Sequence, residues 1–198
     1  MKYVVSRFNH DAEWLKEYTD DLVMYDRSDE PLPGSIVVPN IGTDIYDKLT
    51  YIIDNYDNLP DVAVYTKCNL FKYISKEEFD EVKDNKTFTP LLTKYHHTYS
   101  DPRGIVCYYK DGIYWERNDG WYLAQSPKKH SPEEVMLEMG IWGMEYIPFA
   151  PGSNYILPRE NILKHPKEKY VKLRKYLEHD VYPAEAFIIE RGLYTLWK

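Results

Sequence analysis

Apolar runs of strand length alternate with helical periodicity over the first 85 residues of the chain. The runs that predict strands, rich in β-branched and aromatic residues, are Lys2–Phe8, Asp21–Asp26, Ser35–Asn40 and Val62–Cys68. From Ile41 the apolar residues recur at helical spacing, and this helix is expected to end near Pro60. Such an order of strands and helices predicts a three-layer α/β fold with a mainly parallel sheet.

Capping signals predict two shorter helices beside these elements. Asp11 precedes the sequence AEWLKEY and is expected to cap its helix. Ser75 and Glu78 form a capping box at the start of the sequence KEEFDEVK. The run Val62–Cys68 is largely apolar, which is typical of a central strand that is buried on both faces.

The pattern changes in the middle of the chain. The sequences IVCYYKDGIYWER and WYLAQ, with the turn pairs Asp111-Gly112 and Asp119-Gly120, predict an inserted β-hairpin region. After it, SPEEVMLEMG, HPKEKYVKLRKYLEH and AEAFIIERGLYTLW predict helices, and MEYIPFAPGSNYILP predicts an extended segment. A chain of this length fits one core, so we expect a single α/β domain over residues 1–198.

Charge and hydropathy exclude several classes of protein. No apolar run is long enough to span a bilayer and no secretory signal is visible, so we expect a soluble, cytoplasmic protein. The net charge of −7 argues against nucleic-acid binding, which needs a basic face. The basic stretch Lys164–Arg174 fits the solvated face of an amphipathic helix.

Neither cysteine nor histidine spacing predicts a metal centre. Cys68 and Cys107 are expected to be buried free thiols, because neither has a partner at metal-ligand spacing. The chain also contains no D-x-D pair, with which a transferase can hold Mn²⁺ or Mg²⁺ on a diphosphate. We therefore assign no metal ligands and leave the cofactor open.

Tyrosine is the outlier of the composition, with 20 residues. A ring with a hydroxyl group suits surfaces that bind sugars, because the ring face stacks and the hydroxyl forms hydrogen bonds. Tyrosine equally suits core and sheet positions. Composition alone leaves both interpretations open.

Polar residues follow three of the predicted strands. They are Arg7 and Asn9 after the first, Asn40, Gly42, Thr43 and Asp44 after the third, and Lys67 and Asn69 after the central one. Ligands of open α/β sheets bind outside the carboxyl ends of the strands, so these residues converge on one cleft if the strands are neighbours. The turn before the helix either offers backbone N–H groups to an anion or is a plain cap formed by Asn40 or Thr43.

Two charged residues interrupt the apolar helix that closes the chain. Glu190 and Arg191 stand among Phe187, Ile188 and Leu193. Charges in such a helix are partly buried and need partners. A functional and a structural role remain equally open for this pair.

Five blocks of the sequence resemble a known family in order. They are VVSRFNHDAEWL, DLVMYDRSDEPLPGSIVVPNIG, YDKLTYIIDNYDNLPDVAVYTKCNLF, FAPGSNYILPRENILKHPKEKYVKL and PAEAFIIERGLYTLW. The family is the uncharacterised, glycosyltransferase-like domain of unknown function 3431. Its most specific features in this chain are the Asn-x-Gly turn, the Tyr-Asp-Asn-Leu-Pro-Asp helix end and the terminal Glu-Arg pair.

The chain departs from the family pattern at three places. Thr43-Asp44 stands where Arg-Glu usually follows the Asn-x-Gly turn, which weakens a phosphate-binding role for that turn. Lys67-Cys68-Asn69 replaces Gln-Gly-Asn, and Asn9-His10-Asp11 replaces Asn-Glu-Asp.

The resemblance implies a GT-A-like, Rossmann-like fold and a glycosyltransferase, specifically a hexosyl- or deoxyhexosyl-transferase. Its partners would be a nucleotide-sugar donor and a saccharide acceptor. Asp44 or Glu190 is expected to orient or deprotonate the acceptor hydroxyl. Lys67 and Arg191 are expected to stabilise the departing diphosphate. Trp121 is expected to stack on the acceptor, and the substrate-binding residues are Asn9, Asn40, Gly42, Thr43 and Asn69.

Two other functions compete with sugar transfer. The first is a non-catalytic carbohydrate- or partner-binding domain on the same scaffold, which the missing D-x-D pair favours. The second is a glycoside hydrolase that uses Asp44 and Glu190 as its carboxylate pair, for which the two must face each other within about 10 Å.

Overall fold

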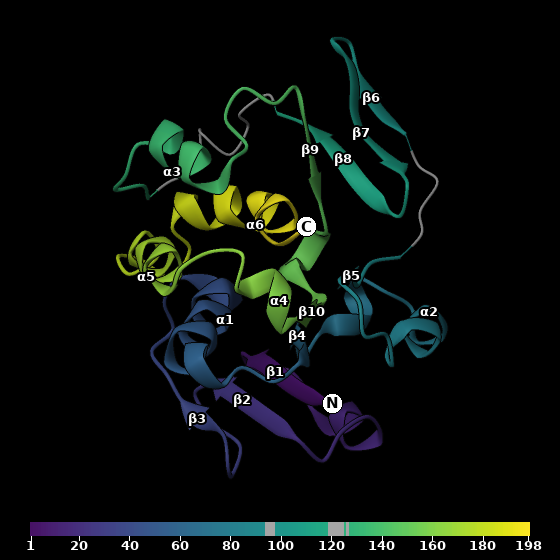
Figure 1. Ribbon diagram of the computed structural model, residues 1–198, viewed down its shortest axis with the longest axis vertical. Coiled ribbons are helices and arrows are strands. Elements are labelled where there is room, and N and C mark those ends of the chain that lie inside the picture. Colours follow the sequence, from purple (N-terminus) through teal and green to yellow (C-terminus); the bar gives the residue numbers. More distant parts are fainter. Residues whose placement is uncertain (94–97, 119–124, 126) are drawn as a thin grey trace.

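The computed structural model describes residues 1–93, 98–118, 125 and 127–198. Six strands form a mixed sheet in the order β3-β2-β1-β4-β10-β5 (Figure 1). They are β1 (Lys2–Arg7), β2 (Leu22–Asp26), β3 (Ile36–Val37), β4 (Val62–Lys67), β5 (Thr89–Pro90) and β10 (Tyr155–Pro158). The prediction of a mainly parallel sheet holds for β1 to β4, whereas β10 runs antiparallel to both of its neighbours.

Helices cover both faces of this sheet because its central strands are apolar on both sides. Tyr3 and Val5 of β1 pack with one core, and Val4 between them packs with the other. The first core lies under the 3₁₀ turns Glu13–Glu17 and Leu70–Lys72 and under α2 (Lys76–Val82). The second lies under α1 (Thr43–Asp54), α5 (Lys167–Lys175) and α6 (Ala184–Trp197). The three-layer prediction is therefore confirmed.

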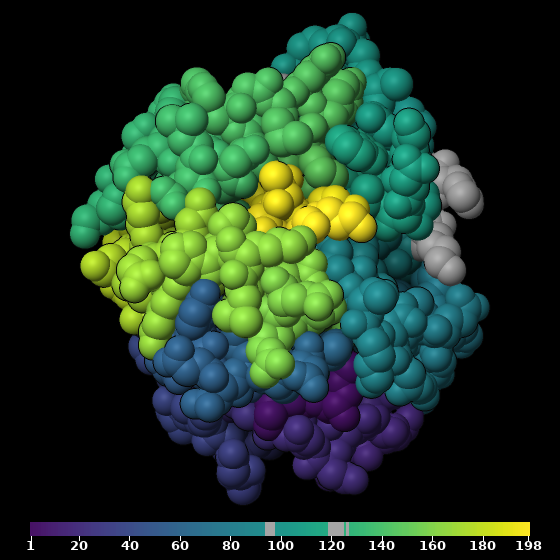
Figure 2. All heavy atoms as spheres, in the orientation of Figure 1, coloured from purple at the N-terminus to yellow at the C-terminus, as the bar shows by residue number. Residues whose placement is uncertain are grey.

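A second, antiparallel sheet lies beyond α6, with strand order β6-β7-β8-β9. Its strands are β6 (Tyr99–Asp101), β7 (Gly104–Lys110), β8 (Ile113–Arg117) and β9 (Tyr146–Phe149). The predicted Asp111-Gly112 turn joins β7 to β8, and both of its residues have positive φ, as a two-residue hairpin turn requires. The pair Asp119-Gly120 lies outside the described residues. Figure 2 shows the second sheet and strands β1 to β3 at opposite ends of the molecule.

Local capping confirms some of the predicted helix starts and corrects another. Ser75 and Glu78 form the expected capping box, and Ser131 accepts the Glu134 N–H at the start of α3 (Pro132–Met139). The AEWLKEY segment is instead a 3₁₀ turn with Ala12 at its N-cap position. Asp11 still accepts the Glu13 N–H at 3.2 Å, but the short segment does not continue into an α-helix.

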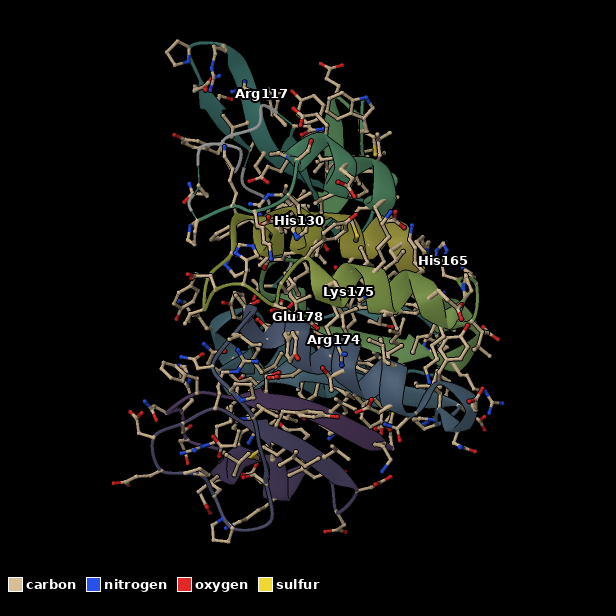
Figure 3. The ribbon with its side chains drawn as sticks, turned by 90° about the vertical axis from the view of Figure 1, so that its left-hand side faces the viewer. Arg117, His130, His165, Arg174, Lys175 and Glu178 are labelled. Carbon is tan, nitrogen blue, oxygen red and sulfur yellow. The ribbon has the colours of Figure 1, made fainter. Side chains whose placement is uncertain are left out.

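Most of the basic stretch Lys164–Arg174 lies in α5, and α4 (Arg159–Ile162) precedes the stretch. Tyr170 and Leu173 of α5 are buried, while Figure 3 shows Arg174 and Lys175 on the side of the molecule turned to the viewer. Lys169 and Lys172 pair with Glu138 of α3 at 2.9 and 2.5 Å. The stretch is thus the polar face of a packed helix, as predicted.

Cys68 is buried and Cys107 is half-buried, and both are free. Within the described residues, no helix has both the length and the apolar character needed to cross a membrane.

Candidate functional site

A cleft opens where the direction of the chain reverses within the six-stranded sheet. From β1 the chain proceeds to β2 and β3, and α1 then carries it back to β4 on the other side of β1. Such a switch point leaves a crevice at the carboxyl ends of the two diverging strands. The cleft here has a volume of about 150 Å³ and is lined by Ser6, Arg7, Phe8, His10, Arg27, Asn40, Thr43, Asp44, Lys67, Asn69 and Tyr182.

The structure brings the three predicted strand ends together in this cleft. Asn40, Thr43, Asp44, Lys67 and Asn69 all line it. Asn9 stands between the lining residues Phe8 and His10 with a φ of 53°. Its backbone N–H donates to Ser28 Oγ at 2.7 Å, so the Asn9 backbone holds the loop after β2.

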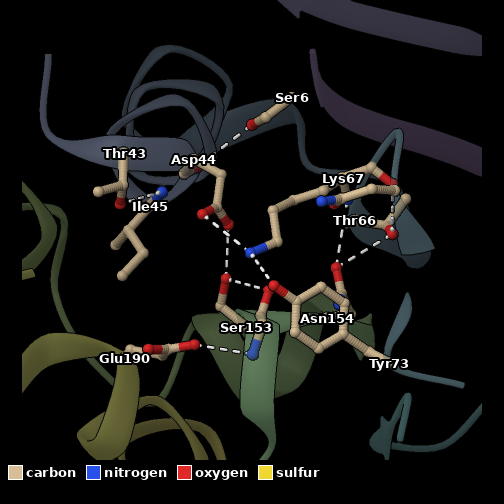
Figure 4. A network of polar contacts seen from close by, with 12 residues as sticks. Ser6, Thr43, Asp44, Ile45, Thr66, Lys67, Tyr73, Ser153, Asn154 and Glu190 are labelled. Atoms are coloured by element: carbon tan, nitrogen blue, oxygen red, sulfur yellow. Dashed lines mark hydrogen bonds and ion pairs between the residues drawn. The ribbon is translucent and has the colours of Figure 1, made fainter. Parts of the chain in front are cut away.

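Asp44 lies at the centre of a buried polar network in the cleft floor (Figure 4). One of its oxygens is 2.5 Å from Lys48 Nζ and accepts the Ser153 hydroxyl at 2.5 Å. Its other oxygen is 3.5 Å from Lys67 Nζ. Burial alone raises the pKa of Asp44, but Lys48, Lys67 and the hydrogen bonds outweigh burial and hold the pKa well below its usual range. Asp44 is therefore a stable carboxylate.

Lys67 is held more loosely than the other cations of the cleft wall. Its ammonium lies 3.3 Å from the Tyr73 hydroxyl and 4.7 Å from the centre of the Tyr73 ring. Burial lowers the pKa of Lys67, yet Asp44 and Tyr73 reverse that effect and raise it above the ordinary value. The side chain keeps 20% of its surface exposed, so a charged ammonium borders the open cleft.

Two arginines of the cleft wall are already committed to buried carboxylates. Arg7 pairs with Asp26 at 2.8 Å and donates to Ser28 and to backbone oxygens of the neighbouring loops. Arg27 pairs with Asp47 at 2.5 Å and donates to the carbonyl of Ile41. Both arginines therefore fix the loops around the cleft.

Four residues in or beside the cleft were not predicted from the sequence, namely Arg27, Asp47, Lys48 and Tyr182. A signal for Lys48 was present, because it falls on the same helical stripe as Ile45, Leu49 and Ile52. A charge on an apolar stripe requires a buried partner. Tyr182 gave no such signal.

The Asn-x-Gly turn is a tight backbone junction. Gly42 and Thr43 have φ values of 63° and 60°, and their N–H groups donate to the carbonyls of Asp180 and Val181 at 2.9 and 3.3 Å. A Cβ at Gly42 would lie 2.7 Å from the Leu177 Cβ, so only glycine fits. Gly42, rather than Asn40 or Thr43, stands at the N-cap position of α1, and the Thr43 hydroxyl accepts the Ile45 N–H at 3.4 Å in the first turn. The Thr43 hydroxyl thus supports the first turn of α1, and two of the N–H groups considered for an anion are occupied.

The charged pair of the closing helix lies apart from the lining of the cleft. Glu190 accepts the Gly152 N–H at 2.7 Å, next to the Ser153 that binds Asp44. Arg191 is buried and pairs with Glu116 of β8. The Arg191 guanidinium thus joins α6 to the second sheet and does not border the cleft. Trp121 lies outside the described residues.

Two further features bear on the chemistry. No group of three or more His, Cys, Asp or Glu side chains that could hold a metal ion occurs in the part of the chain that the structure describes. Because the pKa of Asp44 is held low, this carboxyl cannot serve as the general acid of a glycoside hydrolase near neutral pH.

Comparison with known proteins adds one finding. The family model described as "Protein of unknown function (DUF3431)" matches residues 3–99, which include β1 to β4 and most of the cleft wall. No curated protein and no solved structure matches the chain. The match relates these residues to an uncharacterised domain family and assigns no activity to them.

Proposed function

We propose that the chain is a glycosyltransferase that binds a nucleotide sugar at the cleft and transfers the sugar to a saccharide acceptor. The observation that carries the proposal is the position of the cleft, between the carboxyl ends of β1 and β4. Nucleotide-binding α/β sheets with the order 3-2-1-4 hold their ligand at this switch point. The GT-A-like assignment is part of the same proposal.

Four residues of the cleft, and Glu190 behind it, have roles that their environments support. Lys67 stabilises the oxygen that leaves the sugar, because its ammonium borders the cleft without a tight partner. Asp44 orients a sugar hydroxyl, since a carboxylate whose pKa is held so low is a weak base. Asn40 and Asn69 offer amide groups to further hydroxyls. Glu190 supports the Gly152–Ser153 segment that holds Asp44.

A non-catalytic carbohydrate-binding domain is the second candidate. The observation that favours it is the engagement of Asp44 by Lys48, Lys67 and Ser153, which holds the pKa of this carboxylate low and makes it a poor base. Binding of a sugar without release of a nucleoside diphosphate would support this candidate.

The test is a thermal-shift screen against nucleoside diphosphate sugars, with and without Mn²⁺, followed by an assay for the released nucleoside diphosphate. A ligand that binds only the folded protein raises its Tm. Lys67→Ala should lower turnover about 10²- to 10³-fold, as the loss of one oxyanion-stabilising donor does in other enzymes.

Lys76→Ala is the matched control, since Lys76 is an exposed lysine that pairs with Glu17 on another surface. The proposal fails if no nucleotide sugar raises the Tm, or if Lys67→Ala and Lys76→Ala have the same turnover.

A further inference from the structure

The charges around the cleft cancel. Arg7 pairs with Asp26, Arg27 pairs with Asp47, and Lys67 faces Asp44. Lys48, in the floor, shares Asp44, and the charge of Glu190 acts on both lysines. Each of these cations therefore has a carboxylate in its vicinity, and the wall carries no surplus of positive charge for an anion.

Two N–H groups at the start of α1 are not available to an anion either. The N–H groups of Gly42, the N-cap residue, and of Thr43, the first residue of the helix, donate to the carbonyls of Asp180 and Val181. A phosphate at a helix N-terminus depends on free N–H groups of this kind. The balanced charges and the two occupied N–H groups both indicate that the cleft has no strong preference for an anion.

The size of the cleft restricts its occupant further. Its volume of about 150 Å³ is about half the lower end of the roughly 300–1,000 Å³ of pockets for drug-sized ligands. A single sugar ring is of this scale, whereas a complete nucleotide sugar is much larger.

Two exposed aromatic side chains stand in the otherwise polar wall. Phe8 is 38% exposed and Tyr182 is 58% exposed, and both line the cleft. The backbone beside Tyr182 is fixed, because the carbonyls of Asp180 and Val181 accept N–H groups of the Asn-x-Gly turn and the Tyr182 N–H donates to Asp180 Oδ1 at 3.0 Å. An exposed ring on a fixed backbone is a preformed surface for the apolar face of a sugar.

We infer that the cleft takes a single neutral sugar ring, with its hydroxyl groups on the ion-paired side chains and one ring face on Tyr182, and that the nucleoside diphosphate of a donor lies outside the cleft except for the leaving oxygen, which Lys67 faces at the edge. The inference rests on the proposed function only in taking this cleft as the sugar-binding site. Arginine–carboxylate pairs and amide groups supply both donors and acceptors, which sugar hydroxyl groups need.

The experiment measures thermal shifts and calorimetric binding with free monosaccharides at up to about 50 mM, and with nucleoside diphosphates and inorganic pyrophosphate. Glucose, galactose, mannose, N-acetylglucosamine, fucose and rhamnose are the probes. We expect at least one monosaccharide to bind with a Kd that stays constant between about 50 and 500 mM salt, because a neutral ligand is not screened. Tyr182→Ala should weaken that binding about three- to tenfold, and Tyr182→Phe should change it less than about twofold.

Tyr99→Ala is the control, since Tyr99 of β6 is a similarly exposed tyrosine, at 63%, outside the cleft. If nucleoside diphosphates or pyrophosphate bind with strong salt dependence while no monosaccharide binds, the inference is wrong and the proposed transferase survives. If a monosaccharide binds but no nucleotide sugar does, the inference stands and the proposed transferase fails. Equal effects of Tyr182→Ala and Tyr99→Ala would also overturn the inference.

Discussion

Two of the regions in which charged side chains are buried are the cleft at the strand ends and the junction between the second sheet and α6. In the cleft, Asp44 is shared by Lys48, Lys67 and Ser153, and the cleft beside them is open. In the junction, Arg191 of α6 pairs with Glu116 of β8 and its guanidinium packs over the Phe149 ring. The sequence had suggested a charge-stabilising role for Lys67 and Arg191 alike.

The difference between the two regions lies in what the pairing leaves accessible. Lys67 has partners at 3.3 and 3.5 Å and borders the cleft, so a ligand can approach its ammonium. Arg191 has both its Nε and an Nη engaged by the Glu116 carboxylate. A cationic side chain thus contributes to a binding surface in the cleft, whereas in the junction it attaches the second sheet to α6.

The largest expected loss of stability follows from a substitution in the floor of the cleft. Lys48→Ala removes a fully buried partner of Asp44 and Ser153 and should lower the free energy of unfolding by about 3–5 kcal/mol. Urea denaturation measures this loss. Lys175→Ala, on the exposed part of α5, should stay within about 0.5 kcal/mol of the unmodified protein. Equal losses for the two variants would show that the network contributes little to stability.

The next prediction concerns the pH dependence of stability that arises from Asp47, the partner of Arg27 in the cleft wall. Burial raises the pKa of Asp47 from 3.8 to about 6, although Arg27 and Ser6 oppose the rise. The folded protein then binds a proton more tightly than the unfolded chain, so this group's contribution to stability falls by about 3 kcal/mol as the pH rises from about 3 to 7. Denaturation of the unmodified protein and of Asp47→Asn across this range should show that difference.

Asp44 provides the opposite case on the same helix. Its pKa is lowered, so its stabilising contribution is present above its unfolded pKa of 3.8 and is lost as the pH falls below it. The stability difference between the unmodified protein and Asp44→Asn should therefore shrink on acidification. Slopes of the same sign for Asp47→Asn and Asp44→Asn would contradict the assignment of the two environments.

The smallest loss of stability is expected at the junction between α6 and the second sheet. Glu116→Gln leaves the buried Arg191 with a neutral acceptor, but the Glu116 side chain is 14% exposed and water can compensate in part. We expect the free energy of unfolding to fall by about 1–2 kcal/mol and ligand binding in the cleft to remain unchanged. Calorimetry with the ligand found for the cleft measures the second point. A weaker affinity would connect the junction to the cleft and remove the contrast between the two regions.

Several features of the fold and the cleft followed from local sequence. The apolar runs placed β1 and β4 in the sheet interior, and Asp111-Gly112 fixed the β7–β8 hairpin. These features depend on side-chain periodicity and on turn chemistry, which neighbouring residues determine. The polar residues after β1 and β4 also predicted the cleft, because parallel neighbours end at the same edge of a sheet.

Other features depended on contacts between distant residues. The run Tyr155–Pro158 reads as a strand, but only the tertiary packing inserts it antiparallel between β4 and β5. Arg191 pairs with Glu116, which precedes it by 75 residues, and no local pattern of the sequence predicts that partner. Register and pairing at such distances are set by which faces become buried together.

The sequence by itself determined the strands β1, β2 and β4, the central helix α1 and the polar residues that follow the strand ends. The tertiary structure alone decided that Lys48 and Asp47 are buried and that Tyr182 reaches the cleft from the loop before α6. Charged residues are exposed by default, so a chain read in isolation assigns them to solvent. In the folded protein Lys48 binds Ser153, Asp47 pairs with Arg27, and the loop before α6 binds the backbone at the start of α1. A buried charge needs such partners, and distant segments of the chain supply them here.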